Sequence, residues 1–400
     1  MDFSLSPELA ELAERTAAFV AEVVLPLEAQ DRGVHGIEPE LRSSLQKEAK
    51  AAGLFAPHVA REYGGLGLDT RGQSVVFEEA GYSLLGPQAL NCAAPDEGNM
   101  HLLEQVATEA QKERWLRPLA AGEIRSCFAM TEPPPGAGSD PSMLRSRATR
   151  ADGGWVIDAH KWWTTGAEGA AFAICMADAQ QESGPHGPTM FLVDTGNPGF
   201  QLVRLLDVID RSFAGGHAEV RFESCFVPDD AVLGAVGKGF RYAQVRLAPA
   251  RLTHCMRWLG VARRSLDVAL DHAERREAFG SRLAELGMVQ QQIADSVIDV
   301  ETSRAIIRHT AWVIDTTGPA SSESRHNSSI AKTYVAEAVN RVVDRSVQIC
   351  GGIGVSTETP LGRFLAEVRP FRIYDGPSET HRWAIARRAS RQRAKARSSA

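Results

Sequence analysis

Four short segments combine residue types that can do chemistry, and the last of them places a carboxylate in a turn. The segment 373–382 reads Ile-Tyr-Asp-Gly-Pro-Ser-Glu-Thr-His-Arg, so Asp375 shortly precedes a predicted helix that begins near Ser378. A carboxylate fixed on a loop can act as a general base, because burial raises its pKa and makes it a stronger proton acceptor. The alternative is structural, since Asp375 or Ser378 can simply cap the helix.

The other three segments combine glycines, hydroxyls and aromatic rings. Phe128–Asp140 starts as a strand and enters a Pro/Gly loop whose backbone N–H groups can approach a flat ring or a phosphate. Lys161–Gly166 places two tryptophans before two threonines, an aromatic wall beside hydroxyl groups. Gln348–Gly352 is a predicted helix end whose glycines permit close backbone contact. An ordinary turn and a core tryptophan are the structural alternatives for the first two.

Helical patterns precede these segments along the first 120 or so residues. Ser6-Pro7 predicts an N-cap followed by proline at the first helical position, and Pro26 is expected to end that helix. Further helices are predicted over 38–52, 70–84 and 96–121, with C-terminal caps at Gly53 and Gly122.

The pattern changes to short strands from about residue 125. Runs of β-favouring residues at 155–157, 171–176, 189–194, 201–206 and 218–222 are separated by Gly, Pro and Asp clusters, with no helices between them. This texture predicts a small antiparallel or barrel-like domain with an exposed hairpin tip at 183–188. Because strands and helices do not alternate, a doubly wound nucleotide-binding fold is excluded.

Long helices follow, over about 239–274, 283–316 and 325–350, with a final one from Ser378. The predicted organisation is an N-terminal helical domain (1–124), a middle β domain (125–234) and a C-terminal helical domain (235–387). The remaining segment 388–400 is rich in basic residues and has no acid, so a frayed, flexible and solvated tail is expected there.

Composition excludes several classes of protein. A net charge of −6, with 44% hydrophobic and 24% charged residues, is typical of an ordinary globular protein and argues against a dedicated nucleic-acid binder. No apolar run approaches 18 residues, so a membrane span is not predicted. The six cysteines lack C-x-x-C and zinc-ligand spacing, so we expect buried thiols, no metal site and a cytoplasmic location.

Taken in order, these segments resemble the acyl-CoA dehydrogenase family over essentially the whole chain. Ala129–Pro133 with Gly138–Asp140 is similar to that family's first flavin-binding motif, and Trp162-Trp163-Thr164 resembles its W-I-T contact. Arg276 with Phe279-Gly280 resembles its R-x-x-F-G, Gln348–Gly352 resembles its Q-I-x-G-G, and Tyr374-Asp375-Gly376 resembles the Y-E-G that carries the catalytic base.

The resemblance implies a mainly α fold with a β-barrel-like middle domain and a C-terminal four-helix bundle. It implies FAD as cofactor, a fatty acyl-CoA as substrate and a trans-2-enoyl-CoA as product, as in β-oxidation. It also implies a homo-oligomer, dimer or tetramer, with FAD near the subunit interface and an electron-transfer flavoprotein or similar acceptor. Asp375 would be the base, and Ser139, Arg251 and Gly376 would bind substrate. The residues that match the family's cofactor contacts are Phe128, Met130, Thr131, Ser139, Trp162, Trp163, Thr164, Arg276, Phe279, Gln348, Gly351, Gly352, Pro377, Ser378 and Glu379.

Three departures from the family's pattern concern the substrate and the base. Asp375 stands where Glu is usual, and aspartate reaches about 1.5 Å less far. The T-E-P loop is two residues longer, and Gly287 replaces a common glutamine. The motifs Asp375–His381 and Ala250–Arg257 are similar to those of the branch of family members 10 and 11, which is linked to long or branched acyl chains.

Two other functions stay open at this point. Nitroalkane oxidases resemble the same family and use an aspartate base, so a flavin oxidase is the first alternative. A non-catalytic binding protein is the second, because the basic segment Arg387–Arg397 gives an electrostatic reason to consider nucleic acid.

Overall fold

The computed structural model describes residues 4–31 and 33–398, and its backbone divides into two units. The helical unit comprises Met1–Leu25, Asp69–Pro87 and Ala248–Ala400, and the sheet unit comprises Pro26–Leu68 and Gln88–Leu247. The predicted fold class is confirmed, with N-terminal helical, middle β and C-terminal helical domains. The boundaries at 124 and 234 stay a prediction, because the N-terminal helices divide between the two units.

The N-terminal helices are shorter and more irregular than the sequence predicts. Ser6 caps the first helix as expected, but the helix passes into a π-helical turn at Val20–Val24 and a 3-10 turn at Leu25–Gln30, so Pro26 does not end it. The predicted helix 96–121 is interrupted at Thr108, whose side chain and that of Gln111 form a reciprocal capping box. The bounds are α1 (Pro7–Phe19), α2 (Pro39–Ala51), α3 (Thr70–Ala80), α4 (Gly86–Ala89), α5 (Asp96–Val106), α6 (Glu109–Gln111) and α7 (Arg117–Ala120).

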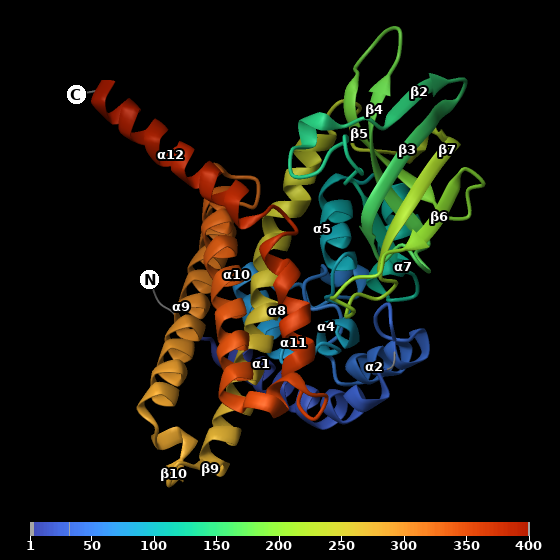
Figure 1. Ribbon diagram of the computed structural model, residues 1–400. Helices are drawn as coiled ribbons and strands as arrows, with labels where there is room; N and C mark the ends of the chain where they lie inside the picture. The colour runs from blue at the N-terminus through green and yellow to red at the C-terminus, as the bar shows by residue number, and fades with distance from the viewer. Residues whose placement is uncertain (1–3, 32, 399–400) are drawn as a thin grey trace. The chain divides into compact units, whose positions relative to one another are not determined.

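The sheet unit contains a mixed, eight-stranded sheet (Figure 1). Its order is β6-β7-β3-β2-β4-β5-β8, with β1 paired to β4. Most neighbours are antiparallel, as predicted, but β1 and β2 both pair in parallel with β4, which the pattern of short strands does not reveal. The bounds are β1 (Ser126–Ala129), β2 (Arg147–Ala151), β3 (Gly154–Thr165), β4 (Phe172–Gln180), β5 (Gly187–Asp194), β6 (Phe200–Leu205), β7 (His217–Pro228) and β8 (Val232–Leu233).

Alternation along the strands creates the core of this unit. On β7, Ala218, Val220 and Phe222 are buried while Arg221 is exposed, as the period of two predicts. Each buried side chain of the size of Val or Phe contributes about 1.5–3 kcal/mol to stability. The sheet is therefore a firm base for the loops that leave its strands. The predicted hairpin tip lies between the antiparallel strands β4 and β5, and its residues 183–186 are exposed.

Long helices build the helical unit, and α10 packs against α9, α11 and α12 (Figure 1). Ser321 caps the start of α10, and Gly351, with φ of +61°, ends it where the sequence predicts an interruption. In Figure 1, α12 starts beside α10 and then extends away from it. The bounds are α8 (Gly239–Arg275), which begins in the sheet unit, β9 (Glu277–Ala278), β10 (Ser281–Arg282), α9 (Gly287–Thr317), α10 (Ser322–Cys350), α11 (Leu361–Val368) and α12 (Ser378–Ser398).

The segment expected to be a frayed tail is helical over its described residues. α12 continues to Ser398, and its side chains from Ala389 onward are exposed. A helix that is polar on all sides and contacts little is marginal on its own in water. The flexibility of 388–400 stays a prediction, and residues 399–400 lie outside the described residues.

Candidate active site

Two of the predicted segments meet in the sheet unit. The Trp162 backbone N–H donates to the carbonyl of Thr131 over 3.0 Å, which joins the end of the β1 loop to β3. Phe128 lies in β1 with the Arg246 guanidinium 4.2 Å from its ring centre. Phe128, Met130 and Thr131 are half-buried beside Trp162, whereas Ser139 is exposed on the loop. The fold therefore brings most of the first and second motifs together.

A buried ion pair organises the loop between these motifs. Lys161, which is fully buried, donates to the Glu132 carboxylate over 2.9 Å and to the Met130 carbonyl over 3.1 Å. The same carboxylate accepts hydrogen bonds from the backbone of Ala137, Arg145 and Ser146 and from the Ser146 hydroxyl. Burial alone would raise the pKa of Glu132, but the Lys161 charge and these hydrogen bonds outweigh it and lower the pKa to about 2. Glu132 is therefore a permanently charged anchor for the loop.

The segment that carries Asp375 forms a turn in the helical unit, between Arg372 and α12; we call it the Asp375 turn. Asp375 has φ of +53° and Gly376 φ of +97°, so two consecutive residues adopt left-handed conformations. Asparagine and aspartate tolerate this region better than most residues, while glycine occupies it freely. A Cβ atom at residue 376 would also come within 2.7 Å of His381 Nε2, so this position requires glycine. The Asp-Gly pair is thus a structural requirement of the turn.

Side chains from three helices hold the backbone of this turn. Arg251 Nε of α8 donates to the Asp375 carbonyl over 2.9 Å, and Lys332 Nζ of α10 donates to the Gly376 carbonyl over 2.8 Å. His381 Nε2 of α12 lies 3.2 Å from the Asp375 carbonyl, so this nitrogen carries the proton. Burial, together with the nearby Arg251 and Lys332 charges, lowers the pKa of His381 to about 4 and keeps its ring neutral.

The carboxylate of Asp375 lies beside a histidine and keeps part of its surface exposed. Its Oδ2 lies 3.4 Å from Nε2 of His254, and its side chain is 18% exposed. Burial lowers the pKa of Lys332 to about 8, although the negative charge of Asp375 opposes this effect. Tyr374, beside Asp375, receives a hydrogen bond on its hydroxyl from Trp258 Nε1 over 2.5 Å. The arrangement is a rigid turn that presents one carboxylate.

Sequence reasoning missed most of the residues that build this turn. Lys332, His254 and His381 come from three helices and are far apart in the sequence, so no spacing rule connects them. In the sequence, His254 and His381 stand out only as members of the motifs Ala250–Arg257 and Asp375–His381. Lys332 is fully buried in the folded protein, but its sequence neighbours include serines and a threonine, so nothing in the sequence around it signals this role.

Comparison with known proteins decides the family. Models of the acyl-CoA dehydrogenase N-terminal, middle and C-terminal domains match residues 6–123, 127–225 and 237–390. A Mycobacterium tuberculosis protein named "Probable acyl-CoA dehydrogenase FadE2" is 37% identical over 97% of this chain and 96% of its own length. The chain belongs to the acyl-CoA dehydrogenase family.

Two further relatives are a longer protein and a solved structure. The mouse acyl-CoA dehydrogenase family member 10 is 36% identical over 96% of the chain, which spans 37% of that longer protein. A solved structure assigned to an acyl-CoA dehydrogenase of Mycobacterium abscessus has a TM-score of 0.90, 34% identity, and coverage of 98% of this chain and 100% of its own. The member 10 protein supports the resemblance to the branch of members 10 and 11 over 96% of this chain.

Thr164 fits the flavin site that the acyl-CoA dehydrogenase family implies. Its Oγ1 is buried, and none of the described residues offers it a hydrogen-bond partner. An unsatisfied buried hydroxyl costs about 1–3 kcal/mol unless a ligand completes it. Beside it, Trp163 is 46% exposed in a left-handed conformation, and its ring meets that of Trp162 edge-on at 6.1 Å. The aromatic wall and the hydroxyl therefore suit a flat ring that bears hydrogen-bonding atoms.

The remaining predicted residues of the helical unit do not gather at the Asp375 turn. Gln348 lies about 24 Å along α10 from Lys332, and Arg276 directly follows the end of α8, which lies about 36 Å along that helix from Arg251, at 1.5 Å per residue. Phe279, at the β9–β10 turn, is 95% exposed. Near the turn, Ser378 is buried at the start of α12, while the Glu379 side chain is 78% exposed. The other predicted residues at the far end of α10, Gly351 and Gly352, are exposed.

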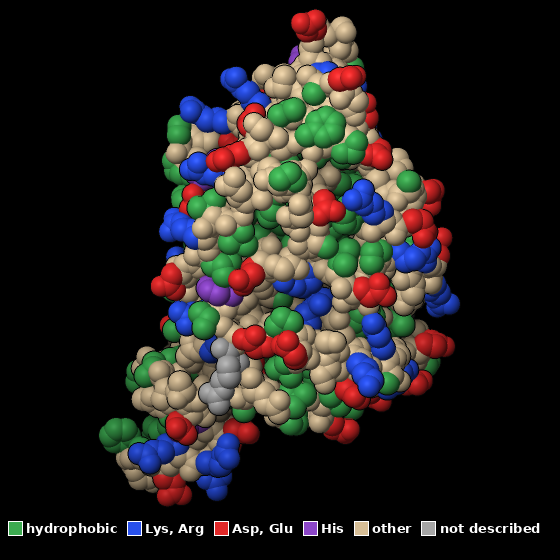
Figure 2. Space-filling model, turned by 90° about the vertical axis from the view of Figure 1, so that its right-hand side faces the viewer, with side chains coloured by type: hydrophobic (Ala, Val, Ile, Leu, Met, Phe, Trp, Pro, Cys, Tyr) green, Lys and Arg blue, Asp and Glu red, His purple; other side chains and the backbone are tan. Residues whose placement is uncertain are grey.

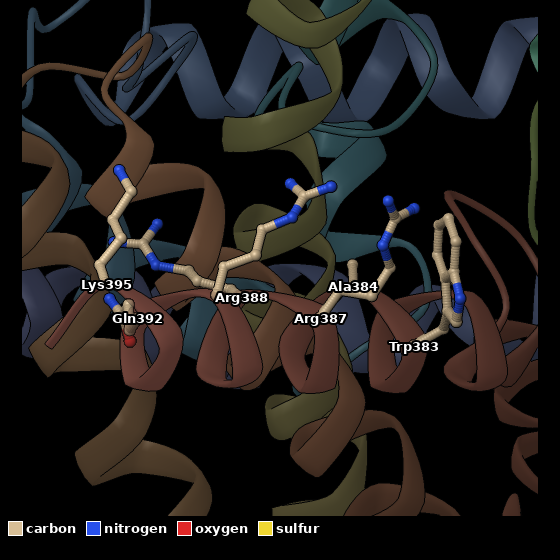
Figure 3. A pocket seen from close by; sticks show the side chains of 7 residues that line it. Trp383, Ala384, Arg387, Arg388, Gln392 and Lys395 are labelled. Carbon is tan, nitrogen blue, oxygen red and sulfur yellow. The ribbon is translucent and has the colours of Figure 1, made fainter. Parts of the chain in front are cut away.

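Surface features outside this region do not coincide with the predicted site. A hollow lies on α12, and the residues that line it all come from that helix, so it is a groove between neighbouring side chains (Figure 3). On the face drawn in Figure 2, acidic and basic side chains are interspersed. Within the described residues, no helix is long and apolar enough to cross a membrane. The residues that line the hollow are Trp383, Ala384, Arg387, Arg388, Arg391, Gln392 and Lys395.

Proposed function

We propose that this acyl-CoA dehydrogenase converts a fatty acyl-CoA thioester to its trans-2-enoyl-CoA, with Asp375 as the base that removes the α-proton. The observation that carries the proposal is the Asp375 turn, in which three helices hold the backbone while the carboxylate stays partly exposed. An α-C–H beside a thioester is a weak acid, so its removal requires an aligned base. A rigid turn supplies that alignment.

FAD is the cofactor that the family uses, and it accepts the β-hydrogen as hydride when it is bound. The residues that suit it are Thr164, whose hydroxyl would donate to a ring atom, and Trp162 and Trp163, which would lie against the ring. Phe128, Met130 and Thr131 adjoin them. Lys161 and Glu132 would keep the loop in shape without contacting the ring.

The shorter base is compensated by how the turn is built. A left-handed aspartate followed by a left-handed glycine projects the backbone of residues 375 and 376 as a tight turn. In the proposal, this geometry brings the carboxylate nearer to the acyl chain, which offsets about 1.5 Å of lost reach. Backbone N–H groups of the same turn would polarise the thioester carbonyl. Arg251, predicted to lie near CoA, also donates to the turn and would act as its support.

The test is Asp375→Asn, which keeps the shape of the side chain and removes its basicity. We expect the purified protein to stay yellow and the rate constant of flavin bleaching by acyl-CoA to fall about 10³-fold. Asp271→Asn, an exposed position on α8, is the matched control and should bleach at the rate of the unmodified protein. Bleaching by Asp375→Asn at the normal rate would refute the assignment of the base.

An acyl-CoA panel with a dye acceptor would define the chain length and branching, and the same assay separates the alternative function. Rapid hydrogen peroxide formation with nitroethane, without bleaching by any acyl-CoA, would identify a nitroalkane oxidase instead. The cytoplasmic location, the role in β-oxidation and an electron-transfer flavoprotein as acceptor belong to the same proposal.

We also propose that the enzyme works as a homo-oligomer. Gln348 lies far along α10 from the Asp375 turn, and Arg276 and Phe279 lie beyond the far end of α8, too far to serve that turn within one chain. A strongly exposed phenylalanine at a hairpin tip suits a contact with another chain. Light scattering combined with flavin absorbance would test this, because Phe279→Asp should lower both the mass and the flavin content, while Phe226→Asp, on β7, should lower neither.

A further inference from the structure

His254 lies directly behind the carboxylate of Asp375. Its Nε2 is 3.4 Å from Asp375 Oδ2, and its side chain is only 7% exposed. The ring packs against those of Tyr374 and Phe371, with centroids 5.0 and 6.1 Å away. Aromatic contacts on this scale fix the orientation of a ring. His254 is therefore a rigid group aimed at one oxygen of the proposed base.

The placement of His254 follows from its position on α8. It comes three residues after Arg251, so both side chains project from the same face of the helix toward the turn. Arg251 donates to the backbone carbonyl of Asp375, while His254 meets the carboxylate of the same residue. One helix face thus contacts Asp375 at two points.

The two oxygens of the carboxylate are in different surroundings. Oδ2, the oxygen near His254, is buried, whereas the Asp375 side chain as a whole keeps 18% of its surface exposed. The exposure therefore comes from other atoms of the side chain. The terminal torsion of aspartate is broad, so a carboxylate on a short stem rotates freely unless a partner fixes it. A partner that fixes one oxygen also sets the direction in which the other oxygen points.

We propose that His254 is a positioning residue for the base: when substrate is bound, its Nε2–H would donate to Asp375 Oδ2, which lies 3.4 Å away, and so aim Oδ1 at the α-carbon of the acyl chain. The inference rests on the proposed function, with Asp375 as the base. When the α-C–H bond breaks, the proton would go to Asp375 Oδ1, and a bound flavin would supply the acceptor for the β-hydride. His254 keeps its own proton throughout.

The charged and titratable groups around the turn have other bonding partners. Arg251 Nε and Lys332 Nζ donate to backbone carbonyls, and His381 Nε2 does the same. Cys255, also on α8, donates its thiol to the Arg251 carbonyl, and burial raises its pKa to about 12, so it stays neutral. These groups hold the backbone of the turn, whereas His254 contacts the side chain of Asp375.

The test uses three substitutions that separate hydrogen bonding from packing. His254→Gln places an amide N–H near the position of Nε2, His254→Asn has the same chemistry but is about 1.5 Å too short, and His254→Leu removes the donor. We expect the rate constant of flavin bleaching to fall about 10- to 100-fold in His254→Leu and His254→Asn. We expect His254→Gln to stay within about 5-fold of the unmodified protein. The acyl-CoA concentration for half-maximal rate should change less than about 3-fold in all three, because Asp375 does not bind the CoA moiety.

Each outcome decides the proposal. Equal rates for the Gln and Asn variants, or a Leu variant at the normal rate, would overturn it. If the Leu variant does not fold, the ratio between the Gln and Asn variants still decides, since both carry an amide. His309→Leu, a half-buried histidine of α9, is the control and should react normally. Asp375→Asn is run beside them: normal bleaching in that variant would refute the base itself, whereas slow bleaching with unaffected His254 variants would refute only the role of His254.

Discussion

Glu132 and Asp375 are two partly or fully buried carboxylates beside a lysine, yet their surroundings differ in one decisive respect. Every group around Glu132 donates to its carboxylate oxygens, namely Lys161, Ser146 and the backbone N–H groups of the loop. Around Asp375, the Arg251 and Lys332 cations donate to backbone carbonyls. A carboxylate whose oxygens accept this many hydrogen bonds from its own chain serves structure, whereas the turn around Asp375 is held mainly through its backbone carbonyls and can present the carboxylate for chemistry.

The same distinction separates two buried threonines of the sheet unit. The Thr189 hydroxyl donates to the Gly187 carbonyl and accepts from the Gly237 N–H, both at 2.9 Å. The Thr164 hydroxyl has no partner among the described residues. Groups that the chain satisfies itself should therefore control stability, while Asp375 and Thr164 should control the reaction and the cofactor.

The largest effect is expected from breaking the buried ion pair between Lys161 and Glu132. Lys161→Met leaves the buried Glu132 carboxylate without its counter-ion, which should cost about 3–5 kcal/mol of unfolding free energy. Denaturant unfolding followed by circular dichroism would measure the loss. Arg150→Met, which breaks an exposed ion pair with Asp229 in the same unit, should cost less than about 1 kcal/mol.

A double variant sharpens this first prediction. Replacing both partners, Lys161→Met with Glu132→Leu, removes the buried charge altogether and should recover part of the loss. A double variant no more stable than Lys161→Met alone would show that Glu132 is not the source of the penalty. It should still bind flavin less well, because the loop loses its anchor.

The second prediction concerns the reach of Asp375. Asp375→Glu adds a methylene group to a carboxylate whose turn is shaped for the shorter residue, and a shift of about 1 Å can lower the rate about 10²-fold. Stopped-flow bleaching by a good acyl-CoA substrate would measure this. An unchanged or faster rate would mean that the turn does not compensate for the shorter side chain.

Sequence reasoning identified what depends on local chemistry. The cap at Ser6, the left-handed glycines at 53 and 122, and the interruption at Gly351 are all confirmed, because each depends on a few neighbouring residues. In the sheet unit, a backbone hydrogen bond from Trp162 to Thr131 joins the first and second motifs, while their role in binding flavin stays a prediction. The six cysteines are buried thiols, as predicted.

What sequence reasoning missed depends on contacts between distant segments. Lys332, His254 and His381 meet Asp375 only after three helices pack, and a one-dimensional pattern does not contain that packing. The π-helical turn after Phe19 and the helix α11 were missed for a related reason, because tertiary contacts override local propensity there. Pro249, inside α8, would by itself have suggested a break in the helix.

The third prediction is a smaller effect: the contribution of the Glu132 carboxylate to the unfolding free energy depends on pH. Because the pKa of Glu132 falls from its usual 4.5 to about 2 in the folded protein, its contribution to stability is complete above pH 4.5 and is lost as the pH falls toward 2. Glu132→Gln should therefore cost about 1–3 kcal/mol at pH 7 and progressively less toward pH 2. Unfolding at several pH values would check this, and a gap that stays constant with pH would contradict it.

The smallest effect is expected from Thr164→Val, and it separates the two kinds of buried threonine. Val has nearly the shape of Thr, so the flavin-free protein should lose no stability, because Thr164 has no hydrogen bond to lose among the described residues. Flavin affinity should fall about 10-fold, since one hydrogen bond to the ring is worth about 1 kcal/mol or slightly more. Titration of the flavin-free protein with FAD would measure this affinity.

Thr189→Val should behave in the opposite way, because its hydroxyl is already satisfied by the chain. Removing it leaves the Gly187 carbonyl and the Gly237 N–H without their partner and should lower the unfolding free energy by about 1–3 kcal/mol. Its flavin affinity should match that of the unmodified protein. If both threonine variants lost stability equally and bound FAD equally well, hydrogen-bond saturation would not distinguish structural from functional groups here, and the contrast between Glu132 and Asp375 would lose its support.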